Sequence, residues 1–205
     1  FDNGTDTQSY SVFVPQLNTS VPISSAKQIG AVLYEYGAVL NHVYKVNNNF
    51  FVQNGVTLYM QRYQNSKTKD IQVFSLSTTP TYSQDKNMYS LTMSVDHIWY
   101  GHVNFLNNYS LKPKYSRSIS KTLLYDISLK YSRKDFYNPN EDKNSDAYEL
   151  SNKLSYVNKD YGFFLGEVVL ADEKRIRGTR TDVSKEYYFL KLSNIYKYTP
   201  TLLLN

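Results

Sequence analysis

The chain has 205 residues, enough for one all-β unit or two small domains, and it carries a net charge of +5, 21 tyrosines and no cysteine. The lack of cysteine excludes disulfides, zinc–thiolate sites and cysteine nucleophiles. No apolar run of about 18 residues is present, so the sequence offers no transmembrane helix, and its scattered Lys and Arg residues form no nucleic-acid-binding face.

The first 25 residues are rich in Asn, Thr, Ser and Gln and contain Pro15 and Pro22. Proline is confined to edge strands and strand ends, because it has no N–H to donate to a neighbouring strand. We therefore interpret residues 1–25 as a linker or an incomplete first strand, and residues 26–205 as a β-barrel domain.

A regular two-residue period begins near Gln28. Successive side chains of a β-strand point to opposite faces, so alternation of apolar and polar residues predicts a strand. Nine segments alternate in this way: 29–46, 50–63, 71–82, 88–100, 109–117, 121–136, 147–157, 163–174 and 187–198. Most are long enough to cross a bilayer, which takes about 9–11 residues in a tilted strand.

The clearest alternation lies in residues 121–136, KTLLYDISLKYSRKDF. One face is apolar or aromatic, and the other is polar: Leu123, Tyr125, Ile127, Leu129 and Tyr131 against Asp126, Ser128, Lys130 and Ser132. This pattern is typical of a strand with lipid on one side and a water-filled interior on the other. A half-buried strand of a soluble protein gives the same pattern.

The connections between the predicted strands also alternate in kind. Tight turns are predicted near Asn48, Asp85, Ile119, Lys159 and Pro200, and longer polar loops near Ser66, Phe105, Glu141 and Asp182. Alternation of short and long connections is the layout of an outer-membrane barrel. The two-residue period slips near His97, which predicts a β-bulge there.

Tyrosines gather on the predicted outward face, many of them near strand ends: Tyr34, Tyr36, Tyr82, Tyr89, Tyr109, Tyr115, Tyr131, Tyr148, Tyr156, Tyr188, Tyr196 and Tyr198. Tyrosine has an apolar body and a polar tip, which suits the boundary between lipid and water. The competing interpretation is that tyrosine is simply a good strand former. The connection pattern favours the membrane interpretation.

The opposite face carries charged residues, which we predict to line the lumen of a barrel: Glu35, Lys45, Asp96, Lys112, Lys114, Asp126, Lys130, Glu149, Lys153, Glu167, Lys191 and Lys197. As a set they would form the polar wall of a pore. Individually they would form salt bridges between neighbouring strands.

No chemistry-bearing motif is present. His42, His97 and His102 lack the spacing of metal ligands, and the sequence contains no GxSxG, P-loop or HExxH motif. We therefore predict no catalytic residue, no metal site and no cofactor, and we expect the protein not to be an enzyme.

Residues 104–136, NFLNNYSLKPKYSRSISKTLLYDISLKYSRKDF, have a cadence in which a strand ends in Tyr-Ser-Arg at a tight turn. The cadence resembles the barrel of outer-membrane proteins of the surface lipoprotein assembly modifier kind and of related tetratricopeptide-linked porins. The resemblance implies a periplasmic helical-repeat domain upstream, further strands downstream and no catalytic residues. The chain departs from the family pattern because it contains neither part and ends in Asn205 rather than in an aromatic residue.

We conclude from the sequence that the chain is an all-β protein, an antiparallel up-and-down transmembrane β-barrel of about nine to ten strands that is incomplete. The expected function is a channel or translocation pore in the outer membrane of a Gram-negative bacterium, for solutes or surface lipoproteins. Its expected partners are membrane lipid, the transported solute or lipoprotein and a periplasmic repeat domain or partner protein, with no nucleic acid.

Two alternatives stay open. The first is a soluble all-β binding or adhesion module whose ligand contacts lie in loops 138–146 and 175–186. The second is a barrel enzyme, which would need a catalytic group at a rim.

Overall fold

The computed structural model describes residues 9–14, 19–24, 33–63, 70–158, 162–176 and 185–195. These residues form strands, turns and one short 3-10 helix, η3 (Glu141–Lys143). No helix in this part of the chain has the length and apolar character needed to cross a membrane.

Two antiparallel sheets are present. A hairpin of β1 (Ser9–Val14) and β2 (Thr19–Ser24) forms its own sheet within the segment that we expected to be a linker or an incomplete strand. The second sheet has nine strands in sequence order: β3 (Leu33–Lys45), β4 (Phe50–Tyr63), β5 (Ile71–Gln84), β6 (Asn87–Tyr100), β7 (Val103–Ser118), β8 (Leu123–Phe136), β9 (Ser145–Asn158), β10 (Gly162–Arg175) and β11 (Lys185–Ile195).

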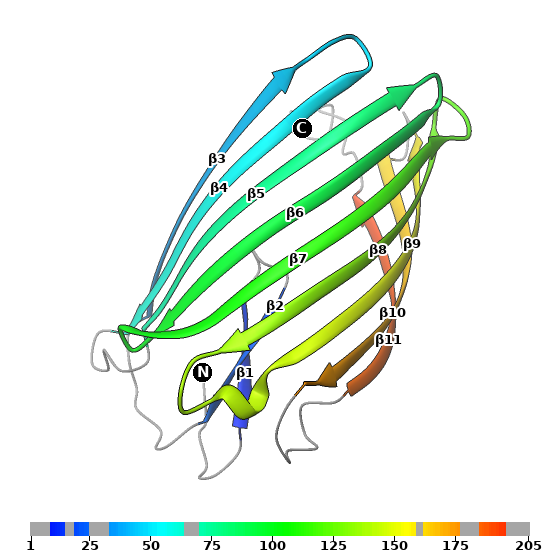
Figure 1. Ribbon diagram of the computed structural model, residues 1–205. Helices are drawn as coiled ribbons and strands as arrows, with labels where there is room; N and C mark the ends of the chain where they lie inside the picture. Colours follow the sequence, from blue (N-terminus) through cyan, green and yellow to red (C-terminus); the bar gives the residue numbers. More distant parts are fainter. Residues whose placement is uncertain are drawn as a thin grey trace, which may run out of the picture.

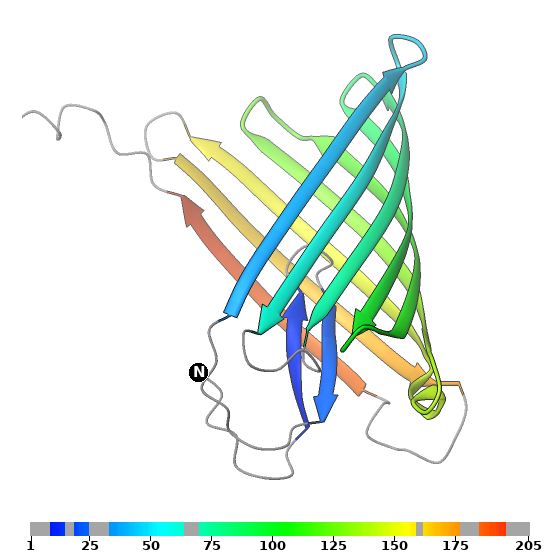
Figure 2. The same ribbon diagram turned by 90° about the vertical axis from the view of Figure 1, so that its left-hand side faces the viewer.

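The nine-stranded sheet curls into a trough (Figures 1 and 2). Every strand pairs with its neighbours in the sequence, and within the described residues β3 and β11 lie at the two edges and do not pair with each other. This confirms the prediction of an all-β, antiparallel, up-and-down sheet that forms an incomplete barrel. Because nine strands is an odd number, the edge strands β3 and β11 run in the same direction.

The strand register separates two faces, since residues opposite each other in an antiparallel ladder lie on the same side. On one face Asp126 and Ser128 are buried, whereas Leu129 on the other is 49% exposed. The buried side is the concave one, because Lys134 of β8 reaches Glu173 of β10 across the intervening strand β9, with Nζ and Oε1 2.8 Å apart.

The connections fall at two ends of the sheet. At the turn end, uppermost in Figure 1, they contain two to four residues: 46–49, 85–86, 119–122 and 159–161. At the opposite end, which we name the loop end, connections 64–70, 137–144 and 176–184 are longer, but 101–102 has only two residues. The predicted connection near Pro200 lies outside the described residues.

The long loop predicted near Phe105 is wrong. Strand β7 begins at Val103 rather than Tyr109, after a two-residue turn in which Gly101 and His102 both have positive φ (58° and 68°). Positive φ at both central residues is the geometry of the tight turns that join paired strands. Residues 103–108 therefore extend the ladder with β6 instead of forming a loop.

An apolar cluster on the concave face at the loop end was not predicted. It joins β4 to β8 and contains Tyr59, Ile71, Val73, Ile98, Phe105, Leu106 and Phe136. The predicted bulge is confirmed as a register shift at Ile98/Trp99. A bulge lets two consecutive residues of one strand point the same way, and Phe105 and Leu106 are both buried. The Phe105 ring packs edge-on against Phe136, with centroids 5.4 Å apart.

Candidate functional site

The concave face brings together the charged residues that the alternation singled out. The register places eleven of the twelve on this face: Glu35, Lys45, Asp96, Lys112, Lys114, Asp126, Lys130, Glu149, Lys153, Glu167 and Lys191. Lys197 lies outside the described residues. Their role as the lining of a lumen stays a prediction. We name this surface, from β3 to β11, the concave wall.

A row of alternating charge crosses the second half of the concave wall. Asp126 lies opposite Lys153, Lys153 opposite Glu167, and Glu167 opposite Lys191. Lys114 of β7 extends the row, because its Nζ lies 3.2 Å from Oδ2 of Asp126. Along this row each charged side chain therefore lies beside one of opposite charge on the neighbouring strand. These contacts favour the observed register of the strands over shifted registers.

Asp126 is the most buried member of this charged row. Its side chain is 7% exposed and lies between Lys114 and Lys153, whose Nζ is 3.9 Å from Oδ2. A carboxylate this deeply buried needs paired cations, because desolvation of an unpaired charge is costly. The hydroxyl of Ser151 donates to Oε1 of Glu167 at 2.7 Å and holds the next acid of the row.

The first half of the concave wall, from β4 to β6, is nearly neutral. It carries hydroxyl side chains that bond to one another, such as Thr79 with Thr92, whose oxygens are 3.1 Å apart. Gly55 provides a close approach here, since a Cβ at this position would lie 2.7 Å from the Ser77 hydroxyl oxygen. The hydroxyl of Tyr59 donates to Glu35 at 3.1 Å.

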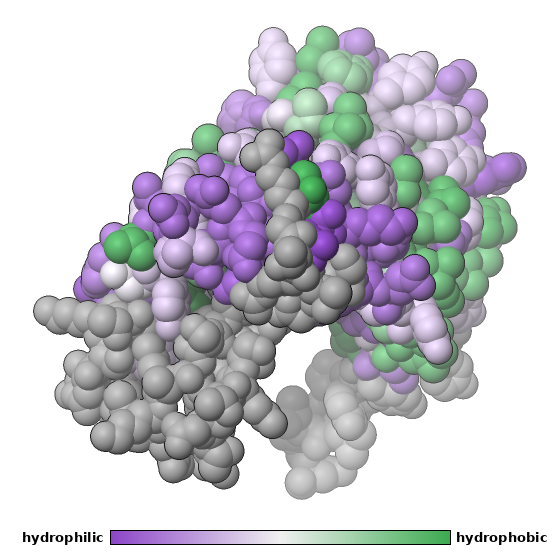
Figure 3. All heavy atoms as spheres, turned by 60° about the horizontal axis from the view of Figure 1, so that its bottom comes forward, coloured by the Kyte–Doolittle hydropathy of each residue, from purple (hydrophilic) through white to green (hydrophobic). Residues whose placement is uncertain are grey.

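The convex face is apolar through its middle. Its central side chains are mostly aliphatic: Leu40, Val56, Leu58, Leu76, Leu91, Met93, Val95, Leu111, Ile127, Leu129, Leu150, Leu154, Val168, Leu170, Leu190 and Leu192. A polar exception, Asn152, accepts a hydrogen bond from the Tyr125 hydroxyl at 2.9 Å. Figure 3 shows hydrophobic residues along the right-hand side of the molecule and hydrophilic residues near its middle.

Aromatic residues border this apolar zone at both ends of the strands. The turn-end row contains Tyr44, Tyr82, Tyr89, Tyr115, Tyr125, Tyr156 and Phe164, each within three positions of the end of its strand. The loop-end row contains Tyr34, Tyr36, Phe74, Trp99, Tyr109, Tyr131, Tyr148 and Tyr188. Ten of the twelve tyrosines expected to face outward lie on the convex face, and Tyr196 and Tyr198 lie outside the described residues.

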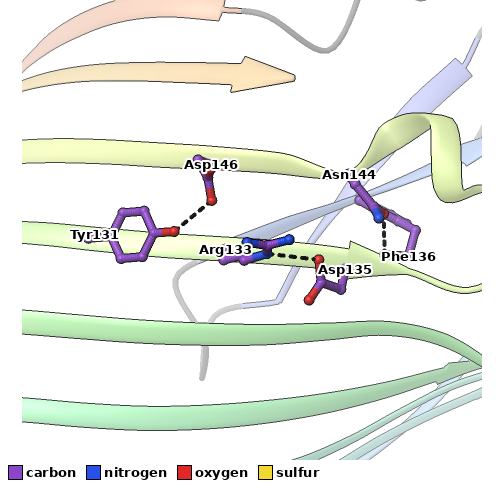
Figure 4. Close-up of polar contacts among 6 residues, drawn as sticks. All are labelled: Tyr131, Arg133, Asp135, Phe136, Asn144 and Asp146. Atoms are coloured by element: carbon purple, nitrogen blue, oxygen red, sulfur yellow. Dashed lines mark hydrogen bonds and ion pairs between the residues drawn. The ribbon is translucent and has the colours of Figure 1, made fainter. Parts of the chain in front are cut away.

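In each row a tyrosine hydroxyl reaches a polar group near the end of a strand. At the turn end Tyr115 donates to Asn87 at 2.8 Å, and its ring packs against Tyr89, with centroids 5.2 Å apart. At the loop end Tyr131 donates to Asp146 at 2.7 Å (Figure 4). The rings of Tyr115 and Tyr131 therefore keep their apolar bodies toward the middle of the strand and their polar tips toward its end.

A polar rim follows the loop-end row on β8 and β9. Nε of Arg133 lies 3.1 Å from Oδ1 of Asp135, and the side chain of Asn144 accepts a hydrogen bond from the backbone N–H of Phe136 at 2.7 Å (Figure 4). The amide of Asn144 thus holds the start of connection 137–144. The rim marks where the convex face changes from apolar to charged.

The described part of the chain contains no group of three acidic, His or Cys residues close enough together to hold a metal ion. His97 is held by Asn107 and Asn104, whose side-chain oxygens lie 2.5 and 3.2 Å from its two ring nitrogens. Nε2 of His102 lies 3.5 Å from Oδ2 of Asp70, beside the two-residue turn 101–102. Both arrangements tie loop-end segments together.

Two apolar grooves of about 440 Å³ open on the sheet. One is lined by Tyr36, Leu58, Met60, Phe74 and Trp99, and the other by Leu154, Tyr156, Phe164, Gly166 and Leu192. Neither is lined by a charged side chain.

The loops of the soluble alternative are only partly described. Connection 137–144 contains η3 and exposes Glu141, while residues 145 and 146 belong to β9. Residues 177–184 of the second loop lie outside the described residues.

A family model described as "Surface lipoprotein assembly modifier" matches residues 2–185, most of the chain. No curated protein and no solved structure matches. The family part of the resemblance carried by residues 104–136 is therefore confirmed.

Proposed function

Because this chain belongs to the surface lipoprotein assembly modifier family, we propose that it forms part of the wall of a β-barrel in a bacterial outer membrane, where it takes part, without enzymatic chemistry, in placing lipoproteins on the cell surface. The observation that carries this proposal is the convex face, which is apolar in its middle and bordered by two aromatic rows. Such a band is what lipid-facing barrel surfaces present.

The distance between the two aromatic rows supports a membrane location. Tyr148 and Tyr156 belong to opposite rows and lie eight residues apart on β9. At about 3.3 Å per residue this is about 26 Å along the strand, and a tilt of about 40° reduces it to about 20 Å across the membrane. The apolar band of outer-membrane barrels is about 25 Å tall.

The two edge strands of the sheet, as far as the described residues show, support an incomplete barrel. Strands β3 and β11 run in the same direction, so pairing them directly would be parallel. An all-antiparallel barrel has an even number of strands. Closure therefore requires an odd number of additional strands between β11 and β3, each edge pairing with a strand of opposite direction.

The polar concave wall would then face a water-filled lumen that serves as a channel or translocation pore. Its charged row would stabilise the pairing of β7 to β11 and give the pore wall its polar character. The loop end, with the longer connections, would face the outside of the cell, and a periplasmic repeat domain would dock at the turn end. Lipid would cover the convex face.

The direct test is to express the full-length protein in a Gram-negative host, fractionate the membranes, and run the protein on gels with and without heating. A membrane barrel partitions into detergent and migrates faster when unheated. A soluble binding module stays in buffer and shows no such shift, which would refute the proposal. Loss of surface-exposed lipoprotein on deletion, restored by the intact chain, tests the assembly role separately.

A further inference from the structure

Two lysines face each other on the concave wall at an interruption of the β7–β8 ladder. Pro113 has no N–H, and the ladder lacks pairs at this point. The register on either side is unshifted, with Leu111 opposite Tyr131. The next pair along is therefore Lys112 opposite Lys130.

Like charges at directly opposite positions destabilise a sheet, because their Cβ atoms are only about 4.5–5.5 Å apart. Lys112 and Lys130 are both half-buried, and neither makes an ion pair or a hydrogen bond with a described residue. Three other lysines of the wall are held by acids: Lys114 and Lys153 by Asp126, and Lys134 by Glu173.

The surroundings of the lysine pair offer further hydrogen-bond donors. Thr92 lies opposite Lys112 on β6, and Ser110 lies two positions along β7 on the same face. Glu149 lies opposite Lys130 on β9, so the row contains two ammonium groups for one carboxylate.

We propose that Lys112 and Lys130 form a binding site for a water-borne multivalent oxyanion of the phosphate or sulfate class. An oxyanion between the two ammonium groups would replace their repulsion with charge-assisted hydrogen bonds, and the neighbouring hydroxyls would donate to its remaining oxygens. The site lies on the polar face, so its ligand comes from water rather than from lipid. The inference depends on the register of β7 and β8 and not on the proposed transport function.

The test is thermal unfolding of the full chain in a non-ionic detergent, with sodium phosphate compared to sodium chloride at matched ionic strength. Phosphate should raise the Tm of the native chain in a saturable manner, as expected for a ligand that binds the folded state. The double variant Lys112→Gln/Lys130→Gln should weaken the apparent affinity by at least about tenfold. Without phosphate this variant should unfold at a higher temperature than the native chain, because the repulsion is gone.

Matched controls separate the site from general charge effects. Lys112→Arg/Lys130→Arg keeps both charges and should keep the phosphate response. Lys174→Gln removes a lysine from the convex face, where it pairs with Asp172, and should also keep it. If the double glutamine variant does not fold, Lys112→Thr carries the same test, since it matches Thr92 opposite.

Three outcomes would overturn the inference. Phosphate could leave the Tm of the native chain unchanged, or it could shift the glutamine variant as much as the native chain. The third is a shift of equal size in micelles doped with phosphatidylglycerol and free of phosphate, which would identify a lipid headgroup as the ligand. None of these outcomes depends on conduction or on lipoprotein display.

Discussion

Replacing Leu129 by lysine separates a lipid-facing convex surface from a water-facing one. Leu129 lies at the middle of β8, opposite Leu150 of β9, and is 49% exposed. In water, burial of the half-exposed leucine contributes at most about 1.5 kcal/mol, since full burial is worth about 1.5–3 kcal/mol. At the midplane of a bilayer, lysine on the lipid face costs about 2–4 kcal/mol.

The measurement is denaturant unfolding of the full-length protein from lipid vesicles, with the free energy of unfolding compared between variants. Gln53→Lys is the matched control, because Gln53 is exposed on the concave face and lies opposite Val43 and Thr79, which carry no charge. Ser128, adjacent to Leu129, is unsuitable as a control. It is 8% exposed and lies opposite Lys114.

A depth series makes this test stricter. Leu123→Lys places the charge on the same face at the turn end of β8, where the cost should fall to about 0–1 kcal/mol. Equal costs for lysine at Leu129, Leu123 and Gln53 would refute the assignment of the convex face to lipid. A large loss of stability for lysine at both Leu129 and Leu123 would instead indicate that protein, rather than lipid, covers the convex face of β8.

Three further substitutions test the concave wall by the same unfolding measurement. Phe105→Ala should destabilise the protein by about 3–5 kcal/mol, because it leaves a cavity in the buried cluster; a loss below about 1 kcal/mol would mean that the bulge does not direct the ring inward. Asp126→Asn should lower the free energy of unfolding by about 1–3 kcal/mol. This is less than for a fully buried pair, because the two lysine partners are about one-third exposed and solvent screens their charges. Asp172→Asn breaks the exposed pair with Lys174 and should lower the free energy of unfolding by less than about 1 kcal/mol. Equal losses of stability for Asp126→Asn and Asp172→Asn would contradict the burial of the charged row. Gly55→Ala should cost about 1–3 kcal/mol, since the new Cβ would lie 2.7 Å from the Ser77 hydroxyl oxygen. Ser77→Gly should recover most of that loss, and an additive double variant would show that the two positions do not touch.

Alternation sufficed to predict the separation of faces, because the side-chain period of a strand is a local property of the backbone. Residues 50–63 were predicted as a strand with the same bounds that β4 has. The apolar and polar faces of residues 121–136 are the convex and concave faces of β8. The charged residues of the concave wall followed from the same rule.

The first half of β7 could not be predicted in this way. Residues 103–108 contain three asparagines, which favour turns over strands. They form a strand because β6 pairs with them around the bulge, while Asn104 and Asn107 contact His97. Pairing with a neighbour therefore outweighed the local preference.

The sequence by itself determined which side of each strand is apolar, how many strands the sheet contains and where its aromatic rows fall, since each of these depends on spacing along the chain. Only the tertiary structure decided which charges meet. Two arrangements depend on the register between strands: the alternating charges of Asp126, Lys153, Glu167 and Lys191, and the placement of Lys112 opposite Lys130. Register is a property of pairs of strands, because a slip of one residue exchanges every side chain between the two faces.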